Sequence, residues 1–308
     1  MIQRLLPFLT LVALFFILSI TSPSFLTATN LASVARQTAV INIMALGMTV
    51  VIISGGIDLS VGSILAIAGL LGAMSMQTHA VAVGLIAGIL AGTACGLANG
   101  LMITTLRINP FIVTLGTMGI YRGLALIVSK GLPVQGVPDS FSFLAEGSLL
   151  GVPFVLWILL ISAVATHIIL QHTRLGRYAF SIGSNPEAAF YAGVPVRFHT
   201  TAVYALAGLL TGVAGMIEAS RLMTGQPTSG QGYELTAIAA VVIGGGSLRG
   251  GEGSVVGTLV GAFIMGLLAN GSDLLGVNPY WQQVLIGAVI IVAVALDEWR
   301  KRRTVSMS

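Results

Sequence analysis

Ten apolar segments, separated by short polar or glycine-rich stretches, restrict the folds that are open to this chain. They lie at about residues 5–20, 40–53, 61–76, 80–103, 111–128, 152–170, 200–216, 235–243, 255–268 and 280–296. Apolar residues make up 56% of the 308 and charged residues only 8%, against about 25% charged in a soluble domain. Lipid accepts an apolar exterior that water would not. The sequence therefore predicts an all-α, polytopic membrane protein with about ten transmembrane helices, in one domain over residues 1–308.

Two of these segments, 40–53 and 235–243, are short and run into glycine-rich breaks. Residues 51–63 and 242–254 align without a gap at a shift of 191 (246 − 55 = 191). Segments interrupted by glycine at matching positions of two halves indicate a transport site between membrane repeats. We therefore expect half-helices or re-entrant segments, with repeat halves at about 1–110 and 196–300. The residues expected to form the translocation path or gate are Gly55, Gly56, Asp58, Ser60, Gly245, Gly246 and Ser247.

The distribution of basic residues predicts the orientation. The loop 171–199 contains Arg174, Arg177 and Arg197, and four consecutive basic residues stand at 300–303. Cytoplasmic loops are enriched in Arg and Lys, so both termini and this loop are expected inside, with both glycine breaks on or near the same side. If one short segment is re-entrant, the two repeats become inverted instead. The net charge of +4 comes mostly from residues 300–303 and does not indicate a nucleic-acid partner.

Two charged positions have alternative interpretations. Asp58 can cap the helix that begins near Leu59, where a carboxylate satisfies free N–H groups. It can also be a gate residue, because ionisable groups at membrane depth usually face a cavity. Glu218 and Arg221 are three residues apart, a spacing that predicts an ion pair on one helix face. The alternative is that this pair is a docking contact for an external partner.

The segment 173–194 predicts a short capped helix between two spans. Ser184 or Asn185 can cap it, Pro186 suits its first position, Glu187 complements the N-terminal dipole and Gly193 ends it. Such a helix is either a simple connector or a rigid element on which a cytosolic partner pushes. We expect Glu187 and Ala189 to lie on its exposed surface. Further upstream, Thr29 or Asn30 is the expected cap of a helix that covers the outer surface or extends the second span.

Enzymatic groupings are not evident in the sequence. The four histidines are scattered, Cys95 is the single cysteine and is expected to be a buried packing thiol, and no metal-ligand spacing occurs. Neither Lys130 nor Lys301 follows a glycine, which excludes the core of a phosphate-binding loop. We therefore expect no cofactor, no metal and no enzymatic activity. If transport uses ATP, a separate subunit must hydrolyse it.

Three stretches, 56–63, 173–194 and 226–251, together resemble the permease subunits of bacterial monosaccharide ABC importers, in the superfamily of binding-protein-dependent sugar and branched-chain amino acid permeases. The resemblance covers nearly the whole chain in order. It implies import of ribose or a related sugar across the bacterial inner membrane. It also implies a homodimer of permease chains, a cytosolic ATPase and a periplasmic sugar-binding protein. The residues that it assigns to coupling with the ATPase are Gly183, Ser184, Asn185, Pro186, Glu187, Ala188, Ala189 and Gly193.

The alternative function is a stand-alone secondary transporter or facilitator for a small polar solute. Ion-coupled carriers commonly place several carboxylates or histidines within their spans. Only Asp58 is a fair candidate here, so the sequence favours the ATP-driven importer.

Overall fold

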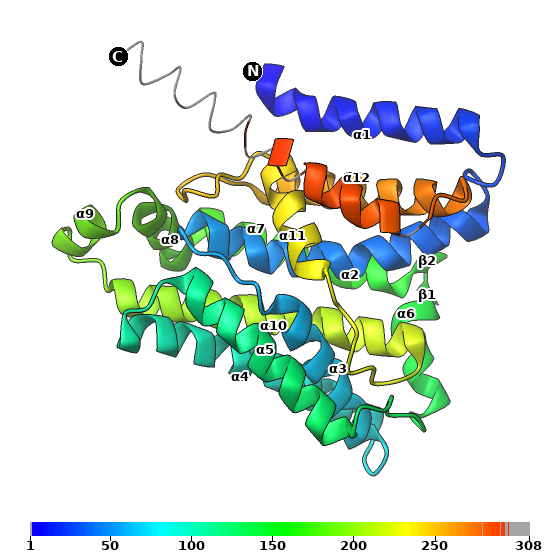
Figure 1. The fold of residues 1–308 in the computed structure, drawn as a ribbon, viewed down its shortest axis with the longest axis horizontal. Helices are drawn as coiled ribbons and strands as arrows, with labels where there is room; N and C mark the ends of the chain where they lie inside the picture. Colours follow the sequence, from blue (N-terminus) through cyan, green and yellow to red (C-terminus); the bar gives the residue numbers. More distant parts are fainter. Residues whose placement is uncertain (1, 279, 290, 293–294, 296–308) are drawn as a thin grey trace.

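The structure, a computed structural model, describes residues 2–278, 280–289, 291–292 and 295, and these residues are almost entirely helical (Figure 1). Its helices are α1 (Ile2–Thr21), α2 (Ala28–Ile53), α3 (Val61–Met76), α4 (Val81–Leu106), α5 (Pro110–Ser129), α6 (Phe143–Glu146), α7 (Phe154–His172), α8 (Arg174–Ser184), α9 (Pro186–Tyr191), α10 (Val196–Leu222), α11 (Tyr233–Ile243) and α12 (Val255–Leu274). A 3-10 turn, η1 (Asp139–Ser142), and a two-residue hairpin of β1 (Ser148–Leu149) and β2 (Val152–Pro153) join α5 to α7. The all-α prediction is confirmed.

Six described helices are long and apolar enough to cross a membrane, namely α2, α4, α5, α7, α10 and α12. Shorter apolar helices are α3, α11 and the stretch Leu5–Thr21 of α1. Residues 280–289 are also helical. The end of the tenth predicted segment and the basic run 300–303 lie outside the described residues. The protein is thus a multi-pass helical bundle, and length alone identifies fewer spans than the ten apolar segments predicted.

The prediction that the second segment is short is wrong. Helix α2 has 26 residues and begins at Ala28, with Thr27 as its cap rather than Thr29 or Asn30. The polar residues near its start do not break the helix, because their side chains find partners on nearby backbone and on α12. Asn30 donates to the Phe25 carbonyl at 2.9 Å and to Asn270 at 3.2 Å. The helix is the central element of the fold. In its apolar, membrane-length stretch 89% of the residues are buried, compared with 22% for the corresponding stretch of α4.

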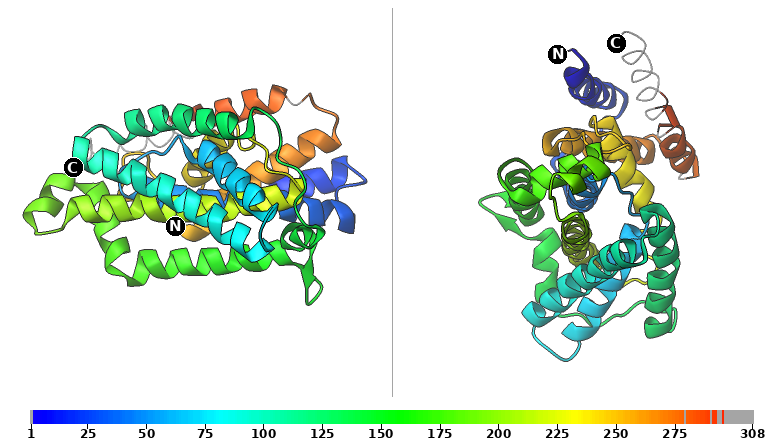
Figure 2. Two further views of the ribbon diagram at one scale, coloured as in Figure 1. Left: turned by 90° about the horizontal axis from the view of Figure 1, so that it is seen from below. Right: turned by 90° about the vertical axis from the view of Figure 1, so that its left-hand side faces the viewer.

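Seven of the other helices lie around α2 in two groups (Figures 1 and 2), and α7 also packs directly against it. Helices α1, α11 and α12 lie on one side of it, and α3, α4, α5 and α10 lie on the other. Helix α1 packs on α12 through a small cluster that includes Leu18 and Leu267. One broken segment, 54–60, follows the end of α2, and the other, 244–254, follows α11.

A stripe of glycines lets α4 and α10 pack backbone against backbone. The buried face of α4 consists mainly of glycines spaced four residues apart, from Gly84 to Gly100. A Cβ added at Gly92 would lie 2.6 Å from the carbonyl oxygen of Gly208 and 2.7 Å from Cα of Gly212. Small residues at such interfaces allow close helix contact in a membrane, where no hydrophobic effect drives association.

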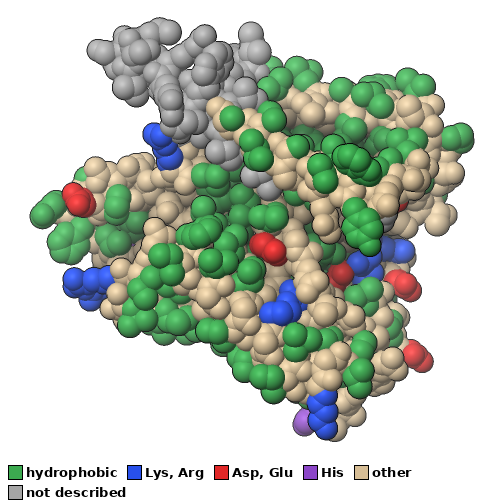
Figure 3. Space-filling view, viewed as in Figure 1, with side chains coloured by type: hydrophobic (Ala, Val, Ile, Leu, Met, Phe, Trp, Pro, Cys, Tyr) green, Lys and Arg blue, Asp and Glu red, His purple; other side chains and the backbone are tan. Residues whose placement is uncertain are grey.

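The surface is mostly apolar, as expected for a protein that faces lipid. Figure 3 shows hydrophobic side chains spread over this face, with few charged side chains, most of them near the ends of the bundle. Helix α9 protrudes at one end, while α6 and the β1–β2 hairpin lie at the other (Figure 1). The charged and irregular parts of the chain thus gather at the two ends, where a membrane protein meets water.

Candidate translocation path and coupling site

The two glycine breaks begin with the same helix-ending motif. After α2, the Gly55 N–H donates to the Ile52 carbonyl at 2.9 Å and the Gly56 N–H donates to the Val51 carbonyl at 3.0 Å. After α11, Gly245 and Gly246 make the corresponding bonds to Val242 and Val241, at 3.0 and 2.8 Å. This pair of bonds needs a left-handed residue, and Gly55 and Gly245 have φ values of 81° and 90°.

The register of the two breaks differs from the gapless alignment of their sequences. The left-handed glycines correspond at a shift of 190 (245 − 55), whereas the next helices begin at Val61 and Val255, a shift of 194. The second break is therefore four residues longer, and abundant glycine hides this insertion when the sequences are aligned. The common feature is the way in which each helix ends.

Both breaks meet at Gly183, which lies in the last turn of α8. The Gly251 N–H donates to the Ile53 carbonyl at 2.9 Å, which joins the second break directly to the end of α2. A Cβ added at Gly250 would lie 2.7 Å from the Gly183 oxygen and 2.8 Å from Cα of Gly55. No Cβ fits at Gly183 or Gly250, so the three backbones are in direct contact. Three segments that are far apart in sequence are thereby joined immediately before α9.

Asp58 ends a chain of hydrogen bonds that runs through the buried interior. Tyr121 donates to the Asn99 side-chain oxygen at 3.0 Å, and the Asn99 amide donates to Ser60 Oγ at 2.8 Å. Ser60 then donates to Asp58 Oδ1 from its hydroxyl at 2.6 Å and from its backbone N–H at 2.8 Å. These bonds fix the first break against α4 and α5. Asp58 Oδ2 is buried and has no hydrogen-bond partner among the described residues.

The capping role predicted for Asp58 has a different geometry from the one expected. Helix α3 begins at Val61, and Ser60 is its cap residue. Asp58 bonds the N–H of Ser60 itself rather than a free N–H inside the first turn. The carboxylate therefore orders the approach to the helix, because the chain between Gly56 and Val61 is extended or turned rather than helical.

Arg122 is a site residue that the sequence reasoning missed. From the middle of α5 its guanidinium donates to the carbonyl oxygens of Pro227 at 2.6 Å, Ser229 at 2.8 Å and Gly62 at 3.2 Å. It thereby joins the loop between α10 and α11 to the start of α3. The available signal was a lone arginine inside an apolar segment, since an ionisable residue at membrane depth is a functional candidate by default.

The predicted short helix of the loop 171–199 is present as α9. Asn185 is its cap and accepts a hydrogen bond from the Ala188 N–H at 2.9 Å, Pro186 stands at its first position, and Glu187 is in its first turn. Gly193 follows the helix with φ 82°. A further helix, α8, precedes it and is capped by Thr173. The prediction of a capped helix is confirmed.

The expected exposure of Ala189 is wrong. Its side chain is buried against Ile182 and Val194, since α9 folds back on the end of α8. The exposed face of α9 instead carries two aromatic side chains, Phe190 at 65% and Tyr191 at 86% exposure. Large exposed aromatic residues are the side chains that most often anchor a protein partner.

Glu218 and Arg221 form the predicted ion pair near the end of α10, with 2.8 Å between Glu218 Oε1 and an Arg221 guanidinium nitrogen. Glu218 is buried, whereas about a third of the Arg221 side chain is exposed. This pair is at the opposite end of α10 from α9.

Cys95 is a free thiol on α4 and is only partly buried. Among the described residues no group of three or more His, Cys, Asp and Glu could hold a metal ion.

Comparisons with known proteins agree with this architecture. A family described as the permease component of the branched-chain amino acid transport system matches residues 30–294. The ribose import permease protein RbsC of Escherichia coli strain K12 is 45% identical over 294 residues, which cover 94% of this chain and 92% of that protein. RbsC of Bacillus subtilis strain 168 is 44% identical over 298 residues, covering 96% and 92%.

A third relative is the D-allose transport system permease protein AlsC of Escherichia coli strain K12, which is 37% identical over 281 residues, covering 91% of this chain and 86% of that protein. No solved structure matches this chain significantly. The helical bundle with two glycine-broken segments thus defines a multi-pass membrane permease. The chain belongs to the family of permease components of ABC import systems that these relatives represent.

Proposed function

We propose that this chain is the membrane-spanning subunit of an ATP-driven importer for ribose or a related monosaccharide in a bacterial inner membrane. The relatives named as ribose and D-allose permeases support the sugar class. The proposed partners are a cytosolic ATPase, a periplasmic sugar-binding protein and a second copy of this chain. The solute crosses by alternating access, driven by ATP hydrolysis in the partner subunit.

One observation carries the proposed mechanism: Gly183, which directly precedes the short loop into α9, contacts both glycine breaks. A movement that the ATPase imposes on α9 reaches the breaks without any flexible side chain between them. The breaks are held in turn by the Asp58 hydrogen-bond chain and by Arg122. Displacing the junction therefore changes the position of α3 and α12, which begin where the breaks end.

The two ends of α10 provide the proposed orientation. The α9 end is placed in the cytoplasm because Arg174, Arg177 and Arg197 lie there. The other end, with Arg221, then faces the periplasm, about 40 Å away along a helix of 27 residues. Arg221 is the member of its ion pair that a sugar-binding protein can reach, because Glu218 is buried.

A stand-alone carrier is less well supported. Among the described residues the fully buried carboxyl groups are those of Asp58 and Glu218, and Glu218 is neutralised by Arg221. Ion-coupled carriers commonly place several carboxylates or histidines within their spans, whereas Asp58 is the one fully buried carboxyl group of the described residues that has no ion-pair partner.

Uptake by reconstituted protein tests the proposal. The chain is placed in liposomes with its ATPase, a sugar-binding protein is added outside, and accumulation of labelled ribose is measured with and without ATP inside. We expect uptake only when all three proteins and ATP are present. Uptake by the chain alone, driven by an imposed ion gradient, would contradict the proposal and support the stand-alone carrier. A panel of related sugars in the same assay then establishes the substrate.

A further inference from the structure

A pocket between α8 and the start of α10 has no role in the mechanism proposed above. It has a volume of about 640 Å³ and opens near the α9 end of the bundle. Its lining residues are Thr173, Arg174, Leu175, Tyr178, Pro195, Phe198, His199 and Ala202. Most of the lining is apolar, and none of these residues is acidic.

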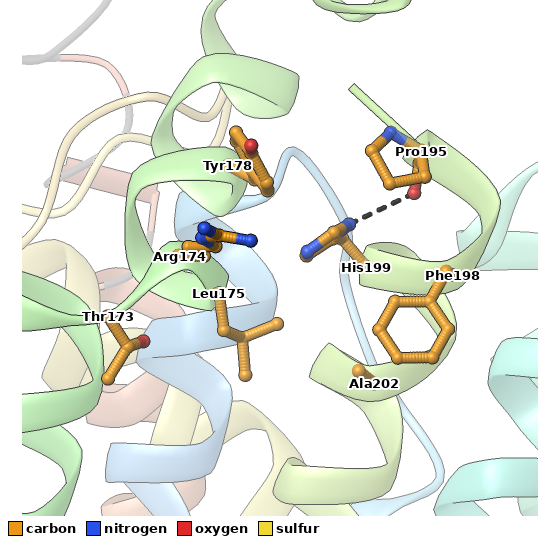
Figure 4. Close-up of a pocket in the computed structure, with 8 residues that line it drawn as sticks. All are labelled: Thr173, Arg174, Leu175, Tyr178, Pro195, Phe198, His199 and Ala202. Carbon is orange, nitrogen blue, oxygen red and sulfur yellow. Dashed lines mark hydrogen bonds between the residues drawn. The ribbon is translucent and has the colours of Figure 1, made fainter. Parts of the chain in front are cut away.

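Two nitrogen-bearing side chains face each other across this pocket. Figure 4 shows Arg174, from α8, and His199, from α10, pointing toward one another. The His199 Nδ1 lies 3.0 Å from the Pro195 carbonyl oxygen. A carbonyl can only accept a hydrogen bond, so Nδ1 is the protonated nitrogen and Nε2 is the one directed toward Arg174. Nε2 has no hydrogen-bond partner among the described residues.

We propose that this pocket binds the phosphate group of an anionic phospholipid. Arg174 would donate hydrogen bonds to the phosphate, and the apolar lining together with the His199 ring would accommodate the upper part of an acyl chain. Phe198 is 70% exposed at the mouth of the pocket, which is the position expected for a side chain in contact with lipid. Basic pockets between helices on the cytoplasmic side are known to hold lipid headgroups. The placement at headgroup level rests on the proposed function, which puts this end of the bundle in the cytoplasm.

The charges around the pocket support an anionic ligand. Arg177 and Arg197 are exposed on the same two helices, so the local field is positive beyond Arg174 itself. The nearest acid in sequence, Glu187, belongs to α9 and does not line the pocket. A zwitterionic headgroup would gain less from this field than a headgroup with net negative charge.

Lipid titration of the purified chain in detergent, followed by native mass spectrometry, tests the assignment without any ATPase or transport. The probes are phosphatidylglycerol, phosphatidylcholine and inorganic phosphate. We expect selective retention of phosphatidylglycerol, with affinity reduced about fivefold by Arg174→Gln, equivalent to about 1 kcal/mol for one basic residue. Arg177→Gln is the matched control, since it removes the same charge from the same helix outside the pocket, and it should weaken binding less than Arg174→Gln does, because it reduces only the local field.

A second variant, Ala202→Phe, fills the apolar part of the pocket and should also weaken lipid binding while Arg174 and His199 remain. Equal retention of phosphatidylglycerol by wild type and both pocket variants would overturn the proposal. Retention of inorganic phosphate by the wild-type chain would also overturn the proposal, because it would indicate a site for a free anion rather than for a lipid. Because no transport is measured, these outcomes are independent of a failure of the proposed importer function.

Discussion

At the scale of single residues, Asp58 is a position where the ordering role and the proposed gate role can be tested separately. Its Oδ1 accepts two hydrogen bonds from Ser60, while Oδ2 is buried without a partner in the described part of the chain. Burying a carboxylate with one oxygen unsatisfied costs free energy. A purely structural cap would not need that arrangement, since asparagine could supply the same acceptor.

The substitution Asp58→Asn separates these roles. Asparagine keeps an oxygen for Ser60, so we expect the melting temperature in detergent to change by less than about 2 °C. We expect sugar uptake to fall about tenfold, equivalent to about 1.4 kcal/mol in the barrier. Asp139→Asn is the control, because Asp139 is exposed. Normal uptake by Asp58→Asn, at equal amounts of inserted protein, would leave Asp58 with an ordering role only.

Sequence reasoning identified Asp58 and the α9 cap because both depend on local patterns. It missed Arg122 because its partners are three carbonyls on segments about 60 and 105 residues away. It placed Ala189 on the surface because the fold-back of α9 onto Ile182 is a tertiary contact. A capping pattern can be predicted from residues that are neighbours in the sequence. The burial of a side chain depends instead on which other segment packs against it in the folded chain.

At the scale of elements, the packing of α4 on α10 depends on glycines rather than on large apolar side chains. Glycine on every fourth residue predicts close helix approach in general, but the partner helix could not be deduced from the sequence. The length of α2 was left open by the sequence, because the helix that begins near residue 29 could either cover the outer surface or extend the second span. The structure shows the extension, with α2 continuous from Ala28 to Ile53.

The substitution Gly92→Val tests this interface. Its side chain would enter space occupied by Gly208 and Gly212, and overpacking of this kind costs about 1–3 kcal/mol. We expect the melting temperature in detergent to fall by about 2–5 °C, because each kcal/mol shifts the melting temperature of a chain of this size by about 1.5 °C. Gly116→Val is the matched control, because a Cβ at Gly116 meets nothing within 4 Å. Equal melting temperatures for the two variants would mean that α4 and α10 do not pack as described.

At the scale of the whole molecule, the two glycine breaks and α8 converge on one junction. The sequence indicated two related breaks and a separate capped helix, but it contained no signal that Gly183 joins them. Contacts between segments about 70 and 130 residues apart follow only from the three-dimensional arrangement of the helices. This convergence is what connects the proposed ATPase surface to the proposed path.

The central claim is that α9 transmits ATP hydrolysis to this junction, and its exposed aromatic pair provides the most direct measurement. The double substitution Phe190→Ala and Tyr191→Ala removes side chains that are 65% and 86% exposed, so folding should be little affected. Tyr280→Ala is the control, because Tyr280 is 75% exposed outside α9. The measurement is the number of sugar molecules imported per ATP hydrolysed by the reconstituted importer. We predict that this ratio falls at least about tenfold in the double variant, equivalent to about 1.4 kcal/mol of lost coupling, and is normal in the control. An unchanged ratio in the double variant would contradict the account.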